Sequence, residues 1–244
     1  MIYKIEGGYA NTYLIEGEEG LVAIDVGSRL AAEKIVDFIT INLGRESSNL
    51  RLITATHFHV DHIGGISELK KRCSQAEINF LFRVDKYLTG EEKLCIPPLA
   101  GWFMSLVPVF IRLNPHFRNA FQAFISKKAG IPLPLLRNFT SIGYQPKCEL
   151  KEGLEIPHLL GWEVIETPGH TQDSICFYRP DDHILISGDT ILNMEGTGEL
   201  NKFCCSHQDI KNSLRRLSTL DVENIYPGHG APILGVKKAL SKVK

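Results

Sequence analysis

The chain has 244 residues, a formal net charge of -1 at pH 7 and 43% hydrophobic residues. That length and apolar content suffice for one well-buried domain, and the near-neutral charge gives no reason to expect nucleic-acid binding. No basic stretch followed by an apolar one opens the sequence, so we expect no signal peptide. The six cysteines form no C-x-x-C pair, which argues against a zinc ribbon or a disulfide framework. We expect ordinary thiols, including the adjacent Cys204 and Cys205, in a reducing cytoplasm.

Short strands alternate with helices in the first third of the chain. Two apolar runs joined by a Gly- and Glu-rich turn predict a hairpin, and Ser28 is placed to cap the helix that follows. A buried strand then leads into a polar motif, and a further helix and strand come after it. The predicted elements cover residues 11–16, 21–25, 30–43, 50–55, 64–73 and 78–82.

The last third repeats this alternation. Pro180 begins the turn between two of three successive strands, and Ser206 is placed to cap a helix. The predicted strands and this helix cover residues 162–167, 174–179, 183–187, 207–220 and 223–226, and a short helix ends the chain. Alternation of strands and helices in both thirds indicates layered α/β packing.

The middle of the chain has a different composition. Residues 94–148 contain no Asp or Glu but six Lys or Arg, so this stretch carries +6 while the remainder carries -7. Such a change predicts an insertion, at about residues 86–148, within a single domain over 1–244. Residues 94–113 are long and apolar enough to suggest a membrane span, but three prolines interrupt them. Asn114 then caps a predicted helix.

The most informative segment follows the strand predicted at 50–55. It places imidazole and carboxylate groups, which are good ligands for zinc and similar ions, close together in the sequence. His57 and His59 can converge on one ion, while Asp61 and His62, further round the turn, can reach a second. Packing these groups into a core without metal would bury charge without partners at a cost of several kcal/mol. We therefore interpret the segment as a metal site.

Three further candidates each follow the end of a predicted strand and stand beside glycine. They are His170, Asp189 and His229. A side chain at a strand end can point into a cleft shared with other strand ends, so these three reinforce the first motif. The sequence thus offers five histidines and two aspartates as ligands for two ions, and predicts a metal-dependent hydrolase.

These segments resemble the five ordered motifs of the metallo-β-lactamase superfamily across about residues 9–234, apart from the insertion. The matching positions are residues 23–27, residues 57–62, His170, Asp189 and His229. The resemblance implies an α+β fold, an αββα sandwich with metal ions at one edge. It is nearer to the dinuclear hydrolase branch typified by glyoxalase II than to the true β-lactamases, which usually replace one or more of these ligands. Redox members with a fused flavin domain are a poorer match.

The resemblance also implies a role for each ligand. The ligands would divide between two ions: His57, His59 and His170 for one, and Asp61, His62 and His229 for the other. Asp189 would bridge the two ions, and Asp25 would support the ligand loop without binding metal. We expect two divalent ions, zinc first, with iron or manganese as alternatives.

Two divalent ions about 3.5–4 Å apart can share and deprotonate one water near neutral pH. The bridging hydroxide would attack an ester, thioester or phosphoester, with Asp61 as proton acceptor or shuttle in addition to its role as ligand. A metal-binding module without catalysis is the non-enzymatic alternative, but the complete ligand set argues against it. The nucleases of the superfamily usually carry extra motifs that this sequence lacks, so we expect no nucleic-acid partner.

The expected substrate is a small molecule. Residues 191–196 lack the basic and aromatic set with which glyoxalase II binds glutathione, and Leu192 stands where lactonase members carry Tyr. An apolar and basic insertion covering the cleft suits an amphipathic anion with an acyl or phosphate group, such as a CoA thioester or a lipid phosphoester. Two alternatives stand beside this one. Residues 94–148 contact a membrane surface, as in a peripheral phosphodiesterase or lipid hydrolase, or they form helix core or a dimer interface.

Overall fold

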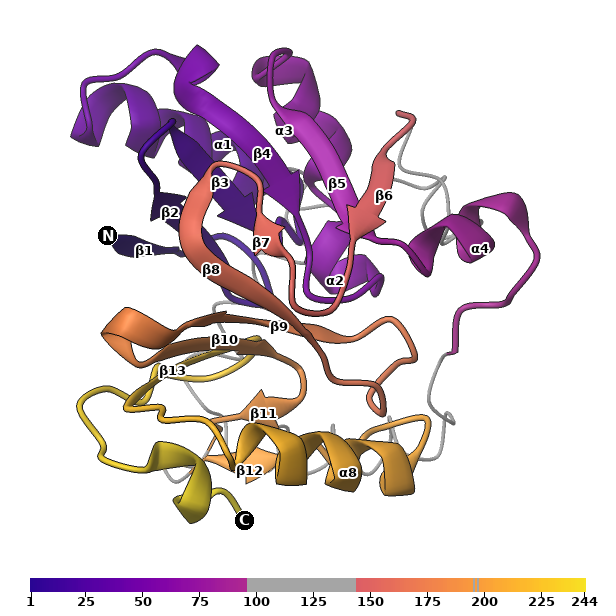
Figure 1. Cartoon of the computed structure of the whole chain (residues 1–244). Coiled ribbons are helices and arrows are strands. Elements are labelled where there is room, and N and C mark those ends of the chain that lie inside the picture. Colours follow the sequence, from indigo (N-terminus) through magenta and orange to yellow (C-terminus); the bar gives the residue numbers. More distant parts are fainter. Residues whose placement is uncertain (96–143, 195, 197) are drawn as a thin grey trace, which may run out of the picture.

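The structure of the chain is a computed structural model that describes residues 1–95, 144–194, 196 and 198–244. Two β-sheets pack face to face, and helices cover the outer face of each sheet (Figure 1). This arrangement of layers is the α+β sandwich that the sequence led us to expect.

The first sheet has six strands that lie in sequence order. Its strands are β1 (Ile2–Ile5), β2 (Thr12–Glu16), β3 (Leu21–Ile24), β4 (Leu50–Thr54), β5 (Glu77–Leu81) and β6 (Lys147–Leu150). The first three strands pair antiparallel, which confirms the predicted β2–β3 hairpin, and the later neighbours pair parallel. Strands β1 and β6, at the two edges of the sheet, were not predicted.

The second sheet has the order β13-β10-β9-β8-β7. Its strands are β7 (Glu155–Ile156), β8 (Leu159–Glu166), β9 (Ile175–Arg179), β10 (Ile184–Gly188) and β13 (Asn224–Pro227). Only the pairing of β10 with β13 is parallel. A separate hairpin joins β11 (Ile191–Leu192) to β12 (Glu199–Leu200). The long predicted strands are confirmed, whereas the two-residue strands were missed.

The described helices are α1 (Arg29–Asp37), α2 (Val60–Ile63), α3 (Ile66–Arg72), α4 (Val84–Thr89) and α8 (His207–Leu217), with single turns at Phe38–Asn42, Ser47–Asn49, Pro180–Asp182 and Ala239–Lys242. Two of them, α1 and α8, begin at the caps that the sequence predicts. Ser28 Oγ accepts from the Ala31 amide at 3.0 Å, and Ser206 Oγ accepts from the Asp209 amide at 3.2 Å. Both predicted N-caps are therefore confirmed.

Side chains alternate across β2 and so supply two layers of core. Tyr13 and Ile15 face the second sheet, while Leu14 packs toward α1 and α3. Trp162 and Phe177 fill the space between the sheets from the other side. Complete burial of a large apolar side chain contributes about 1.5–3 kcal/mol, so this layer holds the two sheets together.

The predicted insertion, residues 86–148, lies mostly outside the described residues, as does the helix predicted from Asn114. At its start the chain forms α4, and at its end Lys147 of β6 pairs with Asn79 of β5. Within the described part of the chain, no helix combines the length and apolar character needed to cross a membrane.

Candidate metal centre

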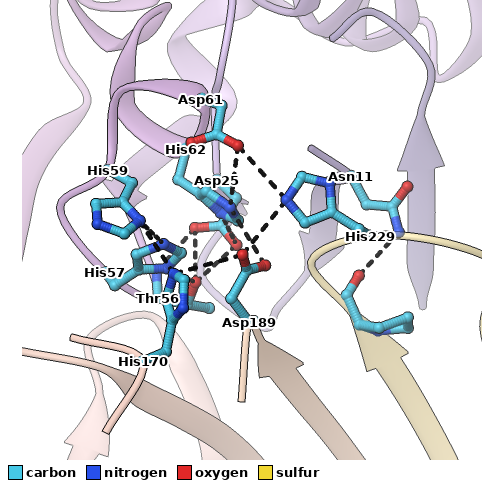
Figure 2. Close-up of polar contacts among 12 residues, drawn as sticks. Asn11, Asp25, Thr56, His57, His59, Asp61, His62, His170, Asp189 and His229 are labelled. Carbon is cyan, nitrogen blue, oxygen red and sulfur yellow. Dashed lines mark hydrogen bonds and ion pairs between the residues drawn. The ribbon is translucent and has the colours of Figure 1, made fainter. Parts of the chain in front are cut away.

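The seven predicted ligand residues lie together where strands of both sheets end (Figure 2). The loop after β4 carries His57 and His59, and the short helix α2 that follows carries Asp61 and His62. Strands β8, β10 and β13 lead to the remaining three: His170, Asp189 and His229. The sheet topology therefore brings together residues that stand up to 172 positions apart in the sequence.

Three sets of potential ligands overlap in this cluster, and one of them combines His57 and His62 with Asp189. Three imidazole nitrogens converge in another set, which we call the His57 group (His57, His59 and His170). His59 Nδ1 lies 3.1 Å from His57 Nε2 and 3.0 Å from His170 Nε2. His57 and His170 are buried, and His59 is partly exposed. Three nitrogens facing one another at this spacing form a candidate cation site.

The second group, which we call the His62 group, consists of Asp61, His62 and His229. Asp61 Oδ2 lies 3.5 Å from His229 Nε2 and 3.9 Å from His62 Nε2. The His62 side chain is fully buried, but the Asp61 side chain keeps 30% exposure. Asp61 is thus the carboxylate through which solvent or a substrate can reach this group.

Asp189 lies between the two groups. Its Oδ2 is 3.5 Å from His170 Nε2, in the His57 group, and 3.4 Å from His229 Nε2, in the His62 group. Its Oδ1 is 3.4 Å from His62 Nε2. One carboxylate therefore faces ring nitrogens of both groups, which is the geometry of a shared ligand.

Hydrogen bonds on the outer side of three histidines decide which ring nitrogen carries the proton. A backbone carbonyl only accepts, so the nitrogen that contacts it must donate, and the inward nitrogen then presents a lone pair. The pairs are His59 Nε2 with the Cys95 carbonyl at 3.2 Å, His170 Nδ1 with the Phe203 carbonyl at 2.6 Å, and His229 Nδ1 with the Tyr9 carbonyl at 3.2 Å. Asn201 Nδ2 also lies 3.1 Å from His170 Nδ1, but the shorter carbonyl contact sets the tautomer.

Asp25 is buried behind the ligand loop. It accepts from the Thr56 amide at 2.7 Å and from Thr56 Oγ1 at 2.9 Å, which leaves Oγ1 to accept from His57 Nδ1 at 3.2 Å. Asp25 Oδ2 is also 3.1 Å from His62 Nδ1. The structure thus places Asp25 against both groups without bringing it into the cluster of inward-facing atoms.

Burial keeps two rings of the His57 group, those of His57 and His170, neutral near pH 7. It lowers the pKa of His57 well below the ordinary value, and the neighbouring imidazoles lower it further. Burial likewise lowers the pKa of His170 to about 4, although the Asp189 carboxylate opposes the shift. Near neutral pH these rings therefore offer lone pairs.

Carboxylates dominate the His62 group instead. Burial alone would lower the pKa of His62, but Asp25, Asp189 and Asp61 outweigh it and raise this pKa well above the ordinary value. Burial and Asp189 act on His229 in the same opposed way, again with a raised pKa. For Asp189, burial opposes ionisation, but His229 and His62 hold its pKa well below the usual range. This group therefore attracts positive charge.

Two buried side chains that hold the site together were missed in the sequence. Asp173 Oδ2 accepts from the amide of Phe58, inside the ligand loop, at 2.8 Å, and Tyr87 of α4 lies 3.4 Å from Oδ1. Asn11 Nδ2 donates to the carbonyls of Pro227 and Gly230, both at 2.8 Å. An acid only three residues after the candidate ligand His170 could have indicated that Asp173 belongs to the site. The residues around Asn11 give no indication of its partners, which lie far along the chain.

Tyr9 and Gly228 shape the rim beside His229. The Tyr9 ring packs against the His229 ring at an interplanar angle of 49°, with centroids 4.7 Å apart, and Tyr9 keeps 42% exposure. A Cβ at Gly228 would overlap the Asp189 carboxylate and touch the His62 ring. Glycine is therefore required for β13 to pass so close to the ligands.

The expectation of six ordinary thiols was wrong. Cys95 and Cys205 form a disulfide with Cα atoms 6.4 Å apart, and the other four cysteines are free. Cys204, next to Cys205, is buried and lies 3.2 Å from His207 Nδ1. The partners stand 110 residues apart, so their pairing depends on the tertiary fold and leaves no trace in cysteine spacing.

Several known proteins are similar to this chain. The probable metallo-hydrolase YflN of Bacillus subtilis is 27% identical over 93% of this chain and 82% of its own length. The acyl-coenzyme A thioesterase MBLAC2 of Bos taurus is 26% identical over 76% of this chain and 59% of its own. The hydroxyacylglutathione hydrolase of Rhodopseudomonas palustris is 27% identical over 81% of this chain and 55% of its own.

The fold also matches solved structures. TTHA1623 in a di-iron-bound form superposes with a TM-score of 0.63 at 22% identity, covering 99% of this chain and 96% of that one. The sequence matches the family described as the metallo-beta-lactamase superfamily over residues 5–229, which include all seven ligand candidates. The chain therefore belongs to the metallo-β-lactamase superfamily of metal-binding hydrolases.

Proposed function

We propose that this protein is a dinuclear metal-dependent hydrolase of acyl thioesters, with acyl-CoA as the substrate class. One observation carries the proposal: five imidazole nitrogens and the oxygens of Asp61 and Asp189 converge in two groups that share Asp189. The family resemblance divides the same residues between two ions, which supports the proposal. Zinc is the first candidate, and the di-iron form of a solved relative is a reason to test iron as well.

The side chains fit metal ions better than they fit one another. In the His57 group, outer hydrogen bonds hold the protons on the far side of the rings, so the inward lone pairs repel each other unless a cation lies among them. In the described part of the chain, buried His62 Nε2 and Asp189 Oδ1 lie 3.4 Å apart, but neither makes a hydrogen bond of good geometry. An unsatisfied buried polar group costs about 1–3 kcal/mol, and a bound ion removes that cost.

A bound pair of divalent ions supplies Lewis acidity for the scissile carbonyl and lowers the pKa of a water. The chain supplies the remaining parts. Asp61, held by His229 and partly exposed, can accept the proton of the attacking water. Asp189 and the buried histidines keep the ligand geometry rigid and exclude bulk water from one side.

Two observations favour an acyl thioester. A relative that matches most of this chain is named as an acyl-coenzyme A thioesterase. The exposed Tyr9 ring beside His229 offers an apolar wall for an acyl chain, and residues 94–148 are both apolar and basic in composition. An acyl chain joined to an anionic carrier matches that combination.

The test is hydrolysis by the full chain after loading with zinc, iron or manganese and measurement of metal content. We expect two ions per chain and turnover of acyl-CoA, with a plain aryl ester and a bis-aryl phosphate cleaved more slowly. Two bound ions with preferential phosphodiester cleavage would replace the thioester proposal by the phosphodiesterase alternative. Two bound ions without any turnover would leave a metal-binding module.

The membrane alternative for residues 94–148 is tested separately. The full chain and a chain that lacks these residues would be sedimented with anionic phospholipid vesicles, while acyl-CoA turnover is followed in parallel. Loss of vesicle binding on deletion, with turnover kept, supports the membrane contact. Loss of turnover without any vesicle binding supports a cover over the substrate.

A further inference from the structure

The Cys95–Cys205 disulfide crosses the molecule beside the metal centre. Cys95 follows α4, which lies next to the first sheet, and Cys205 immediately precedes the N-cap of α8, which covers the second (Figure 1). The Cα separation of 6.4 Å lies within the range that a disulfide spans. Both cysteines are partly exposed, so a reductant in solution can reach the bond.

Each half of this disulfide is hydrogen-bonded to a histidine of the His57 group. The Cys95 carbonyl accepts from His59 Nε2 at 3.2 Å. The Cys205 amide donates to the carbonyl of His170 at 3.1 Å and to that of Gly169 at 2.9 Å. The covalent bond thus joins the two backbone groups that hold His59 and His170 on opposite sides of one candidate ion site.

His59 depends on this support more than its neighbours do. His57 and His170 are buried and are also held by Thr56 and Phe203. His59 is partly exposed, and on its outer side the described residues offer the Cys95 carbonyl. Outer partners of this kind fix the tautomer and orientation of a ligand histidine, and their loss typically weakens metal binding about 10- to 100-fold.

We infer that Cys95 and Cys205 are positioning residues for the His57 group, so that metal occupancy of this group depends on the redox state of their disulfide. With the bond formed, the Cys95 carbonyl stays against His59 and the inward nitrogens converge. With the bond reduced, residue 95 is no longer tied to α8, and His59 loses its fixed orientation. Among the described residues, no hydrogen bond joins the His62 group to either cysteine, so this group keeps its ion. This inference rests on the proposed dinuclear centre.

The reductant is a dithiol. One of its thiolates attacks a sulfur of the disulfide and forms a mixed disulfide, and its second thiol then displaces the remaining protein sulfur. The dithiol ends as a disulfide. Cys95 and Cys205 end as two thiols and have gained two electrons and two protons.

The chain contains its own control in Cys204. This cysteine is adjacent to Cys205 but is free, buried and outside the disulfide. Cys204→Ser removes one thiol from the same loop and leaves the disulfide in place. The test variants are Cys95→Ser and Cys205→Ser.

The experiment measures metal affinity and stoichiometry of the full chain in the oxidised and reduced states, after dithiothreitol has been removed by anaerobic gel filtration. We expect oxidised wild type and oxidised Cys204→Ser to hold two ions. Reduced wild type, Cys95→Ser and Cys205→Ser should bind one of the two ions about 10- to 100-fold more weakly. Circular dichroism would follow the fold in each sample.

Two further variants assign the sensitive ion. In a His229→Gln chain, which keeps the His57 group, the remaining ion should be lost on reduction. In a His170→Gln chain, the remaining ion should be indifferent to reduction.

Equal affinities in both redox states would overturn the inference, as would free Cys95 and Cys205 found by alkylation and mass spectrometry of protein isolated without reductant. Loss of both ions together with the fold on reduction would also overturn it, because the disulfide would then stabilise the whole fold and not one ion site. These outcomes concern metal binding. Failure to hydrolyse any thioester, with redox-dependent metal binding intact, would count against the proposed function alone.

Discussion

The two ligand groups of the proposed metal centre are built from similar residues but differ in charge. The His57 group consists of imidazoles, and burial lowers the pKa of His57 and His170. The His62 group contains a carboxylate and lies against Asp25, so the pKa values of His62 and His229 are raised despite burial. Protons therefore compete with metal for His62 and His229 more than for His57 and His170. Ligand identity alone does not show this difference, since the surrounding carboxylates produce it.

The largest effect on metal affinity is expected from substitution of Asp189, the carboxylate that faces both groups. Asp189→Asn takes a buried negative charge from between them, so binding of both ions should weaken about 100- to 1000-fold, as expected for breaking a buried charge pair. Metal titration with both ions resolved would measure it. The exposed Asp181→Asn, the same chemical change far from the centre, should behave as wild type. A loss confined to one group would show that Asp189 is not shared.

Asp25→Asn should lower metal affinity at one group more than at the other. Asn tolerates the positive φ of 60° at this position, so the backbone can remain as it is. Asp25 lies directly against His62 but reaches His57 only through Thr56, so the His62 group should lose about 10- to 100-fold in affinity and the His57 group less. Isothermal titration of the metal-free variant checks this, with exposed Asp37→Asn as the control. Equal losses at both groups would contradict the assignment.

As the pH falls, the His62 group should release its ion before the His57 group does. A raised pKa means that His62 and His229 hold protons over a wider pH range, and an ion must displace them to bind. Affinity at the His62 group should therefore fall as pH falls, by about tenfold per pH unit for each displaced proton. In the His57 group, burial lowers the pKa of His57 and lowers that of His170 to about 4, so this ion should be released at lower pH than the ion of the His62 group. Metal content after equilibrium dialysis from pH 8 to pH 4 would show two steps, and release in the reverse order would refute the comparison.

The smallest effect is expected at the rim. Tyr9→Ala removes the ring that packs against His229 but keeps the backbone carbonyl that orients the imidazole. Both ions should remain bound, and KM for long acyl chains should rise about tenfold, the equivalent of about 1.4 kcal/mol of apolar contact. Tyr9→Phe, which keeps the ring, should retain the wild-type KM. An unchanged KM in Tyr9→Ala would mean that acyl chains do not pass this side of the centre.

Most of the correct predictions depended on residues that lie close together in the sequence. Ser28 and Ser206 cap helices through contacts three residues away, and the ligand histidines follow strand ends that show as apolar runs. The missed features depend on partners far along the chain. β6 is exposed or partly exposed at three of its four positions, so it has no apolar pattern of its own and is a strand because β5 lies beside it. The same holds for Cys95 with Cys205 and for Asp173 with Phe58.

The hydrogen bonds between Asn11 and the C-terminal part of the chain have a consequence for biosynthesis. The Asn11 side-chain amide binds the carbonyls of Pro227 and Gly230, a separation of up to 219 residues, and His229 stands between those two carbonyls. A ribosome releases the first sheet, with the loop that carries His57 to His62, long before it releases this last ligand. The nascent chain therefore carries a partial ligand set for most of its translation. Loading of the complete centre must wait until residue 229 has left the exit tunnel.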